Sequence, residues 1–317
     1  MSNSDTPRAD TAHPGAVHAS TVDPPRAAVL AVVDAALAED APWGDVTSEA
    51  AIPADARATA RVVSRVSGVL AGGLALELAF TRADASLTVV RHLADGAELE
   101  PGALVATVSG SARGILLGER VALNLAQRLS GVATLTRRYV DAVAGTRARI
   151  VDTRKTTPGL RMLEKAAVRA GGAHNHRFSL SDAVMLKDNH LAVLAAQGLD
   201  LTQAIRTVRE RIPHTTHLEV EVDRLDQLDA VLAAEPDTIM LDNFSLDDLR
   251  AGVAHIAGRA TVEASGGVTL ESVRAIAETG VDVISVGALT HSAPALDLGL
   301  DVGLDVVLGG VLAGGHP

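Results

Sequence analysis

The sequence predicts an α/β fold in which a small sheet domain precedes parallel strands arranged as a barrel. Six short apolar runs in the second half alternate with helical segments, and several end in polar or glycine-rich residues. An earlier stretch is rich in β-branched residues and turns. Strand–helix alternation is typical of parallel α/β folds, whose chemistry lies at the C-terminal ends of the strands.

The composition and net charge of the chain exclude several kinds of site and partner. The 317 residues have a formal net charge of -11, no cysteine and 2% aromatic residues. These values exclude disulfides and cysteine-based metal sites, and they argue against nucleic acid as a partner. No apolar run is long enough to span a membrane and the N-terminus is polar, so we expect no membrane partner and a cytoplasmic location.

The first half predicts a tail followed by the small sheet domain. Residues 1–24 lack hydrophobic periodicity and are expected to be disordered. A helix at 25–39 leads into a loop at 39–47, whose Trp43 is interpreted as a packing anchor. Further on we expect strands at 58–66, 87–93 and 104–108, a helix at 74–80, and a long helix at 119–143 with a break at Ser130-Gly131.

The second half predicts six strand–helix steps, fewer than a complete barrel needs. The expected strands are 150–151, 183–186, 218–222, 238–241, 261–264 and 283–286. The expected helices between them are 201–211, 224–234, 246–255 and 270–278. The pattern alone does not place residues 292–317.

Residues 147–187 form a basic stretch in an acidic chain. They include nine basic residues against three acidic ones, and they contain all three lysines of the protein. Lys155 and Lys187 lie at strand ends and are candidate site residues, whereas Lys165 is equally compatible with a helix surface. So local an excess of cations predicts a site for a small, highly charged anion.

Carboxylates and glycines follow the later strands. Glu219 and Glu221 alternate on one strand and Asp242 ends the next, so they could bind a divalent cation or stabilise a cationic transition state. Glu219 is the favoured candidate, and Glu221 could equally form a structural salt bridge. The loops at Ser265–Gly267 and Val286–Ala288 are typical of barrel sites that bind phosphate through backbone N–H groups.

These features together predict a phosphate-bearing polyanion, partly chelated by magnesium, as substrate. For His176, in the basic stretch, hydrogen bonding to an anion is favoured over zinc ligation. The sequence has no serine–histidine–acid arrangement, Walker A loop or dinucleotide fingerprint. Electrostatic positioning is therefore the expected mode of catalysis.

Several segments closely resemble the quinolinate phosphoribosyltransferase family. The most specific are ERVALNLAQRLSGVATLT (119–136), DTRKTTPGLRMLEKAAVRAGGAHNHR (152–177) and LKDNH (186–190). The segments EDAPWGDVTS (39–48), EASGG (263–267) and VGALTHSAPALDLGL (286–300) also fit. The resemblance thus covers nearly everything after the tail.

The resemblance implies the reaction of quinolinate with phosphoribosyl pyrophosphate (PRPP), giving nicotinate mononucleotide, pyrophosphate and CO2, with Mg2+. It implies an incomplete parallel α/β barrel preceded by a small open-faced α/β sandwich domain. The sandwich would comprise residues 25–125, with 292–317 returning to it, and the barrel residues 126–291. A homodimer or higher homo-oligomer is expected.

It also implies roles for individual residues. Arg154, His176, Arg177 and Lys187 should clamp the two carboxylates of quinolinate, and Arg120 should reach in from the partner subunit. Lys155, Glu219 and Asp242 are the expected catalytic residues around the ribose and the metal-bound pyrophosphate, with Glu219 and Asp242 as metal ligands. The remaining expected substrate contacts are Thr153 and the phosphate loops Ser265, Gly266, Gly267 and Val286, Gly287, Ala288.

Three alternatives stay open at this point. A nicotinate phosphoribosyltransferase would share the fold, although nicotinate lacks the second carboxylate and needs a smaller cation cluster. A molybdenum-transport-associated homologue is another transferase of the same fold. A non-catalytic barrel that binds a phosphate ligand would leave Glu219, Asp242 and the two strand-end lysines without a role.

Overall fold

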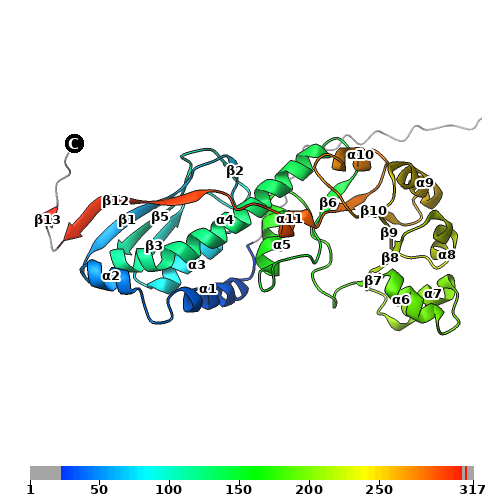
Figure 1. The fold of residues 1–317 in the computed structure, drawn as a ribbon, viewed down its shortest axis with the longest axis horizontal. Helices are drawn as coiled ribbons and strands as arrows, with labels where there is room; N and C mark the ends of the chain where they lie inside the picture. Colours follow the sequence, from blue (N-terminus) through cyan, green and yellow to red (C-terminus); the bar gives the residue numbers. More distant parts are fainter. Residues whose placement is uncertain (1–22, 309–310, 313–317) are drawn as a thin grey trace, which may run out of the picture.

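The structure is a computed structural model that describes residues 23–308 and 311–312. Two main sheets lie toward opposite ends of an elongated molecule, and the long helix α4 (Ala112–Ala142) runs between them (Figure 1). Nearly all of the predicted tail at 1–24 lies outside the described residues.

The first sheet is antiparallel and has the strand order β13-β12-β1-β5-β3. Helices α3 (Gly73–Ala83) and α4 pack together beside it, and α1 (Arg26–Asp40) packs on α3. The strands are β1 (Arg57–Ser64), β3 (Thr88–Arg91), β5 (Leu104–Ser111), β12 (Leu298–Leu308) and β13 (Val311–Leu312). A separate short pair joins β2 (Gly68–Val69) to β4 (Glu98–Leu99).

The last long strand returns to this first sheet. β12 pairs antiparallel with β1 from Ser64↔Leu298 to Arg57↔Val307, beside the contact of β1 with β5. The sheet to which residues 25–125 contribute is therefore completed by a segment from the far end of the chain (Figure 1).

The second sheet is parallel and has the strand order β6-β11-β10-β9-β8-β7. Strands β6 and β7 are consecutive in sequence yet form its two edges, so the sheet is an open, incomplete barrel. This confirms the predicted fold class. The strands are β6 (Arg149–Val151), β7 (Val184–Leu186), β8 (Leu218–Val222), β9 (Thr238–Asp242), β10 (Thr261–Ser265) and β11 (Val283–Ser285).

Helices separate these strands along the chain. The expected helix at 224–234 divides into a 3-10 turn and a short helix, and that at 270–278 is shorter than predicted. The elements are α5 (Arg161–Ala170), α6 (Asp188–Ala195), α7 (Leu201–Arg211), η1 (Leu225–Gln227), α8 (Leu228–Leu232), α9 (Leu246–Ile256), α10 (Val273–Ala277) and α11 (Ala288–His291).

Helix α4 corrects one prediction. It begins at Ala112, where the Ser111 hydroxyl accepts the N–H of Gly114 at 3.2 Å, and it continues without a break through Ser130 and Gly131. A Cβ at Gly131 would overlap the backbone oxygen of Pro294. The small residues therefore allow close packing and do not end the helix. The predicted domain boundary at residue 125 falls inside this helix.

The predictions for residues 39–47 are partly wrong. Asp45 caps a short helix, α2 (Val46–Ala51), by accepting the N–H groups of Thr47 and Ser48, both at 3.0 Å. Trp43 is 94% exposed and is not a packing anchor among the described residues. The composition of the loop did not reveal which way its one aromatic side chain points.

Candidate active site

A cavity of about 540 Å³ opens at the C-terminal ends of the parallel strands. We call it the central cavity. It contains most of the residues that the sequence predicted for the site, although these are far apart along the chain. Its lining comprises Thr153, Arg154, Lys155, His176, Arg177, Met185, Lys187, Glu221, Met240, Asp242, Asn243, Glu263, Ser265, Gly266, Gly267 and Ser285.

The strand ends explain this convergence. Residues 153–155 follow β6, Lys187 follows β7, Asp242 ends β9, and Ser265 ends β10 before Gly266. Parallel strands present their carboxyl ends at one edge of the sheet, so these side chains meet there.

Two guanidinium groups face the central cavity with few partners. Within the described part of the chain Arg154 forms no ion pair, and its buried Nε has no hydrogen-bond partner. Arg177 donates to the carbonyl of Ala183 at 3.2 Å. Burial, and then the nearby charge of Arg154, lower the pKa of Arg177. Two like charges held close together at a cavity provide a strong site for an anion.

The two lysines at the strand ends differ in their surroundings. Lys187 forms a close ion pair with Glu221, which also lines the central cavity. Lys155 is exposed, and the hydroxyl of Thr153 accepts its backbone N–H at 3.0 Å. Its side chain lies against Gly287, where a Cβ would come within 2.9 Å of Lys155 Cδ.

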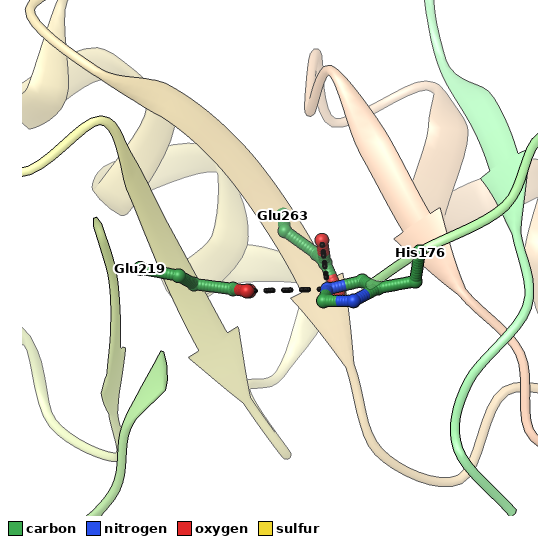
Figure 2. A group of neighbouring side chains, drawn as sticks. All are labelled: His176, Glu219 and Glu263. Atoms are coloured by element: carbon green, nitrogen blue, oxygen red, sulfur yellow. Dashed lines mark ion pairs between the residues drawn. The ribbon is translucent and has the colours of Figure 1, made fainter. Parts of the chain in front are cut away.

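A histidine and two glutamates form a cluster, whose side chains point toward one another in Figure 2, and His176 and Glu263 also line the central cavity. Nε2 of His176 lies 3.1 Å from Glu219 Oε2 and 3.5 Å from Glu263 Oε2, and both glutamates are only 3% exposed. The other oxygen of each carboxylate is buried without a hydrogen-bond partner among the described residues. Nδ1 accepts the backbone N–H of Arg177 at 2.7 Å.

The cluster binds a proton tightly. Burial of the ring acts to lower the pKa of His176, but the hydrogen bonds and charges of Glu219 and Glu263 outweigh it and raise the pKa to about 10. Burial, and to a lesser degree the charge of Glu263, also raise the pKa of Glu219. Because the Arg177 N–H uses the lone pair of Nδ1, the ring hydrogen is on Nε2, and the additional proton belongs to the cluster of His176, Glu219 and Glu263 as a whole.

The same three residues have the composition of a metal site, and their ligand atoms all lie within 4.8 Å of one another. A metal at Nε2 would need that nitrogen's lone pair and hence the ring hydrogen at Nδ1. The backbone N–H of Arg177 points at Nδ1. The ring is therefore arranged to share a proton with the two glutamates.

The carboxylates differ from the predicted pair. Glu219 faces His176 and is not among the residues that line the central cavity, whereas Glu221 and Asp242 both line it. The predicted metal ligands Glu219 and Asp242 are thus not presented together at this surface. Alternation correctly placed Glu219 and Glu221 on one face of β8, but Glu219 lies one step farther from the strand end and is deeper.

The two predicted phosphate loops also differ. Gly266 has a φ of 95°, and a Cβ there would overlap the side-chain amide of Asn243, so only glycine fits. The N–H of Asn243 donates to the carbonyl of Ser265 at 2.9 Å and joins the ends of β9 and β10. Val286, Gly287 and Ala288 do not line the central cavity, although Gly287 lies under Lys155.

Arg120 and Lys165 both lie outside the lining of the central cavity. Arg120 is an exposed residue of α4, 3.9 Å from Glu119, and does not line the central cavity of its own chain. Lys165 is 2% exposed and pairs with the fully buried Asp152, so a surface position is wrong. Its spacing from Val168, three residues on, was the available sign that it faces the apolar side of α5.

Both halves of the chain match one family of known proteins. The family "Quinolinate phosphoribosyl transferase, C-terminal domain" matches residues 132–301, and the corresponding N-terminal domain matches residues 45–130. A "Nicotinate-nucleotide pyrophosphorylase [carboxylating]" from Mycobacterium leprae is 45% identical over 274 residues, covering 84% of this chain and 94% of the relative. A probable one from Bacillus subtilis is 43% identical, covering 83% and 89%.

Solved structures give the same result. The crystal structure of NadC from Streptococcus pyogenes superposes with a TM-score of 0.84 at 40% identity, covering 89% of this chain and 99% of that chain. The nicotinate-nucleotide pyrophosphorylase from Francisella tularensis gives a TM-score of 0.82 at 36% identity, covering 89% and 98%. The similarity therefore extends over both sheets.

Proposed function

This chain belongs to the quinolinate phosphoribosyltransferase family, and from that membership we propose how its central cavity performs the reaction. The protein transfers the phosphoribosyl group of PRPP to quinolinate with loss of CO2, giving nicotinate mononucleotide and pyrophosphate for NAD synthesis. The observation that carries the site assignment is the pair of guanidinium groups, Arg154 and Arg177, beside the carboxylates of the same cavity.

In this proposal Arg154, Arg177 and Lys187 hold the two carboxylates of quinolinate. A planar guanidinium can bind a carboxylate through two parallel hydrogen bonds, which fixes orientation as well as affinity. His176 lies beside them, but both of its ring nitrogens already have partners within the protein. We therefore assign His176 chiefly to holding Arg177 in place.

PRPP would occupy the other side of the cavity. The backbone at Ser265, Gly266 and Gly267 is open enough to bring N–H groups to the 5′-phosphate. Lys155 extends over Gly287, so the second loop, Val286–Ala288, would act on the phosphates through the position of this lysine. The hydroxyl of Thr290 donates to the Lys155 carbonyl at 2.8 Å and fixes the two segments together.

The chemical steps follow from these positions. As pyrophosphate leaves, C1 of the ribose becomes cation-like, and the carboxylates of Asp242 and Glu221 can stabilise that charge. Attack by the pyridine nitrogen makes a pyridinium ring. When the adjacent carboxylate departs as CO2, its bonding electron pair stays on the ring carbon, where the neighbouring positive nitrogen stabilises it until that carbon takes up a proton from water. The clamp contributes by holding the nitrogen toward C1, and such orientation is worth several kcal/mol, on the order of 7 or more in favourable cases.

Glu221 and Asp242 fit Mg2+ bound to the pyrophosphate, because hard carboxylate oxygens are its usual protein ligands. Bound there, the ion would neutralise charge on the leaving group. Chelation with EDTA should abolish turnover, and added Mg2+ should restore it. Asp242→Asn should raise the Mg2+ concentration needed for half-maximal rate, while quinolinate binding without PRPP, measured by calorimetry, should not respond to EDTA. Full activity in EDTA would contradict the assignment.

The oligomeric state of the protein and its cellular location are also proposals. Because Arg120 is exposed on α4 and away from its own cavity, we propose a homodimer or higher homo-oligomer in which it reaches the partner's cavity. No helix among the described residues is both long enough and apolar enough to cross a membrane. The expected cytoplasmic location is compatible with that finding.

One assay tests the substrate assignment. The purified protein is given PRPP and Mg2+ with either quinolinate or nicotinate, and released CO2 and nicotinate mononucleotide are measured. We expect both products from quinolinate and negligible turnover of nicotinate, which lacks one of the carboxylates that the clamp binds. Preferential turnover of nicotinate would refute the diacid clamp.

A further inference from the structure

A buried ion pair lies beneath the cationic residues of the central cavity and is not part of its lining. Asp152 immediately follows β6 and is 0% exposed, and Lys165, on α5, is 2% exposed. The Lys165 ammonium donates to Oδ1 of Asp152. Neither residue lines the central cavity, and neither has a role in the mechanism proposed above.

The ion pair binds both backbone groups of His176, the residue directly before Arg177. The N–H of His176 donates to Asp152 Oδ1 at 2.8 Å, and Lys165 Nζ donates to the carbonyl of His176 at 3.1 Å. Asn175 adds a further tie, because its amide nitrogen donates to Asp152 Oδ2 at 2.7 Å and to the Lys165 carbonyl at 2.9 Å.

The contacts join two segments that each carry a guanidinium of the clamp. Asp152 lies two residues before Arg154, and His176 lies directly before Arg177. The backbone continues the connection, since Asp152 N–H donates to the His174 carbonyl at 3.2 Å and His174 N–H to the Ile150 carbonyl at 3.0 Å. The ion pair therefore acts together with these backbone contacts to fix the spacing of the two guanidinium groups.

Stability alone is a weak reason for such a pair. Removing two charges from water costs several kcal/mol per ion, and neutral residues of similar size are often equally or more stabilising. What an ion pair adds at this position is a donor and an acceptor in fixed places, which can hold the carbonyl and the N–H of a single peptide segment at once.

We propose that the Asp152–Lys165 ion pair is a positioning device that sets the distance between Arg154 and Arg177 and so determines the affinity for a diacid. The inference rests on the proposed clamp. A displacement on the order of 1 Å in a positioning contact can lower a rate roughly a hundredfold. The effect should fall more on quinolinate than on PRPP. The proposed PRPP contacts on β8, β9 and β10 do not touch the pair, and Lys155 is held separately by the Thr290 hydroxyl, which donates to its carbonyl at 2.8 Å.

Two variants separate positioning from stability. Asp152→Asn keeps the shape and one acceptor but leaves Lys165 buried without a counter-charge, so the melting temperature should fall. The double variant Asp152→Asn, Lys165→Met removes that isolated charge and should recover much of the melting temperature. We expect the KM for quinolinate to be raised about tenfold or more in both variants, with the KM for PRPP within about twofold of the wild-type value.

Asp95→Asn is the matched control. Asp95 accepts the N–H groups of Gly72 and Gly73, both at 2.9 Å, at the start of α3 and away from the central cavity. It should lower the melting temperature without altering either KM. Active-site titration corrects all rates for the fraction of folded enzyme.

The deciding comparison is whether the KM for quinolinate recovers together with the melting temperature in the double variant. If the KM for quinolinate returns to the wild-type value as the melting temperature recovers, the pair has only a structural role and the inference is wrong. Equal increases in both KM values would also contradict it. Arg154→Ala, measured in parallel, distinguishes failure of the clamp from failure of the positioning role. Normal kinetics of Arg154→Ala would refute the clamp. Impaired kinetics of Arg154→Ala together with normal kinetics of the double variant would refute only the positioning role.

Discussion

Arg154→Ala should lower kcat/KM for quinolinate by about a hundredfold or more while the melting temperature stays close to that of the wild type. Arg154 forms no ion pair in the described part of the chain, so the fold does not depend on its charge. Each hydrogen bond to a carboxylate contributes about 1.5–3 kcal/mol, and a guanidinium can make two of them. Steady-state kinetics with quinolinate varied at saturating PRPP measure the loss.

Two further variants make this result specific. Arg154→Lys retains the positive charge but not the planar fork and should lose about tenfold. Arg209→Ala removes an arginine that is paired with Asp237 at 2.9 Å outside the cavity lining, and it should leave both kinetic constants unchanged. Near-normal turnover by Arg154→Ala would mean that quinolinate binds elsewhere.

Gly131→Ala should destabilise the protein, although it adds only one methyl group to a helix. The new Cβ would overlap the backbone oxygen of Pro294, and backbone cannot move aside as a side chain can. Overpacking typically costs about 1–3 kcal/mol, against a gain of up to about 1 kcal/mol from replacing glycine in a helix. We expect the melting temperature to fall by several degrees, roughly 5 °C, in a calorimetric scan.

Gly252→Ala provides the comparison, because Gly252 also lies within a helix, α9. Its nearest neighbour is the end of the Leu241 side chain, at 2.8 Å from the added Cβ, and that side chain can rotate. This variant should be close to neutral. Equal melting temperatures for the two variants would show that the segment around Pro294 can shift to accommodate the methyl group.

The sequence pattern was sufficient for the six parallel strands and the long helix α4, but it did not place the strand β12 or the helices α5 and α6. The alternation of apolar runs and helical segments predicted the six parallel strands, and the clustering of cations between residues 147 and 187 predicted the side of the cavity that Arg154 and Arg177 form. These features are local in sequence. Strand ends also converge by a general rule of parallel sheets, so the meeting of distant residues could be predicted.

The sequence could not show how deeply a side chain is buried or which way it points. Period-two alternation placed Glu219 and Glu221 on one face, but it did not show that Glu219 is buried against His176 while Glu221 reaches the cavity. Nor did it show that Trp43 is turned outward or that Gly131 admits a passing backbone. The surroundings of Glu219 and Gly131 depend on His176 and Pro294, which lie far away along the chain.

The return of β12 to β1 also bears on how the protein is made. Chains are synthesised from the N-terminus and domains begin to fold as they leave the ribosome. β1 (57–64) is synthesised well before its second neighbour, β12 (298–308), which lies far along the chain. Until β12 is synthesised, one edge of β1 has unpaired N–H and C=O groups, which can recruit strands from other chains. Nascent chains that stop before residue 298 should therefore depend most on chaperones to avoid aggregation.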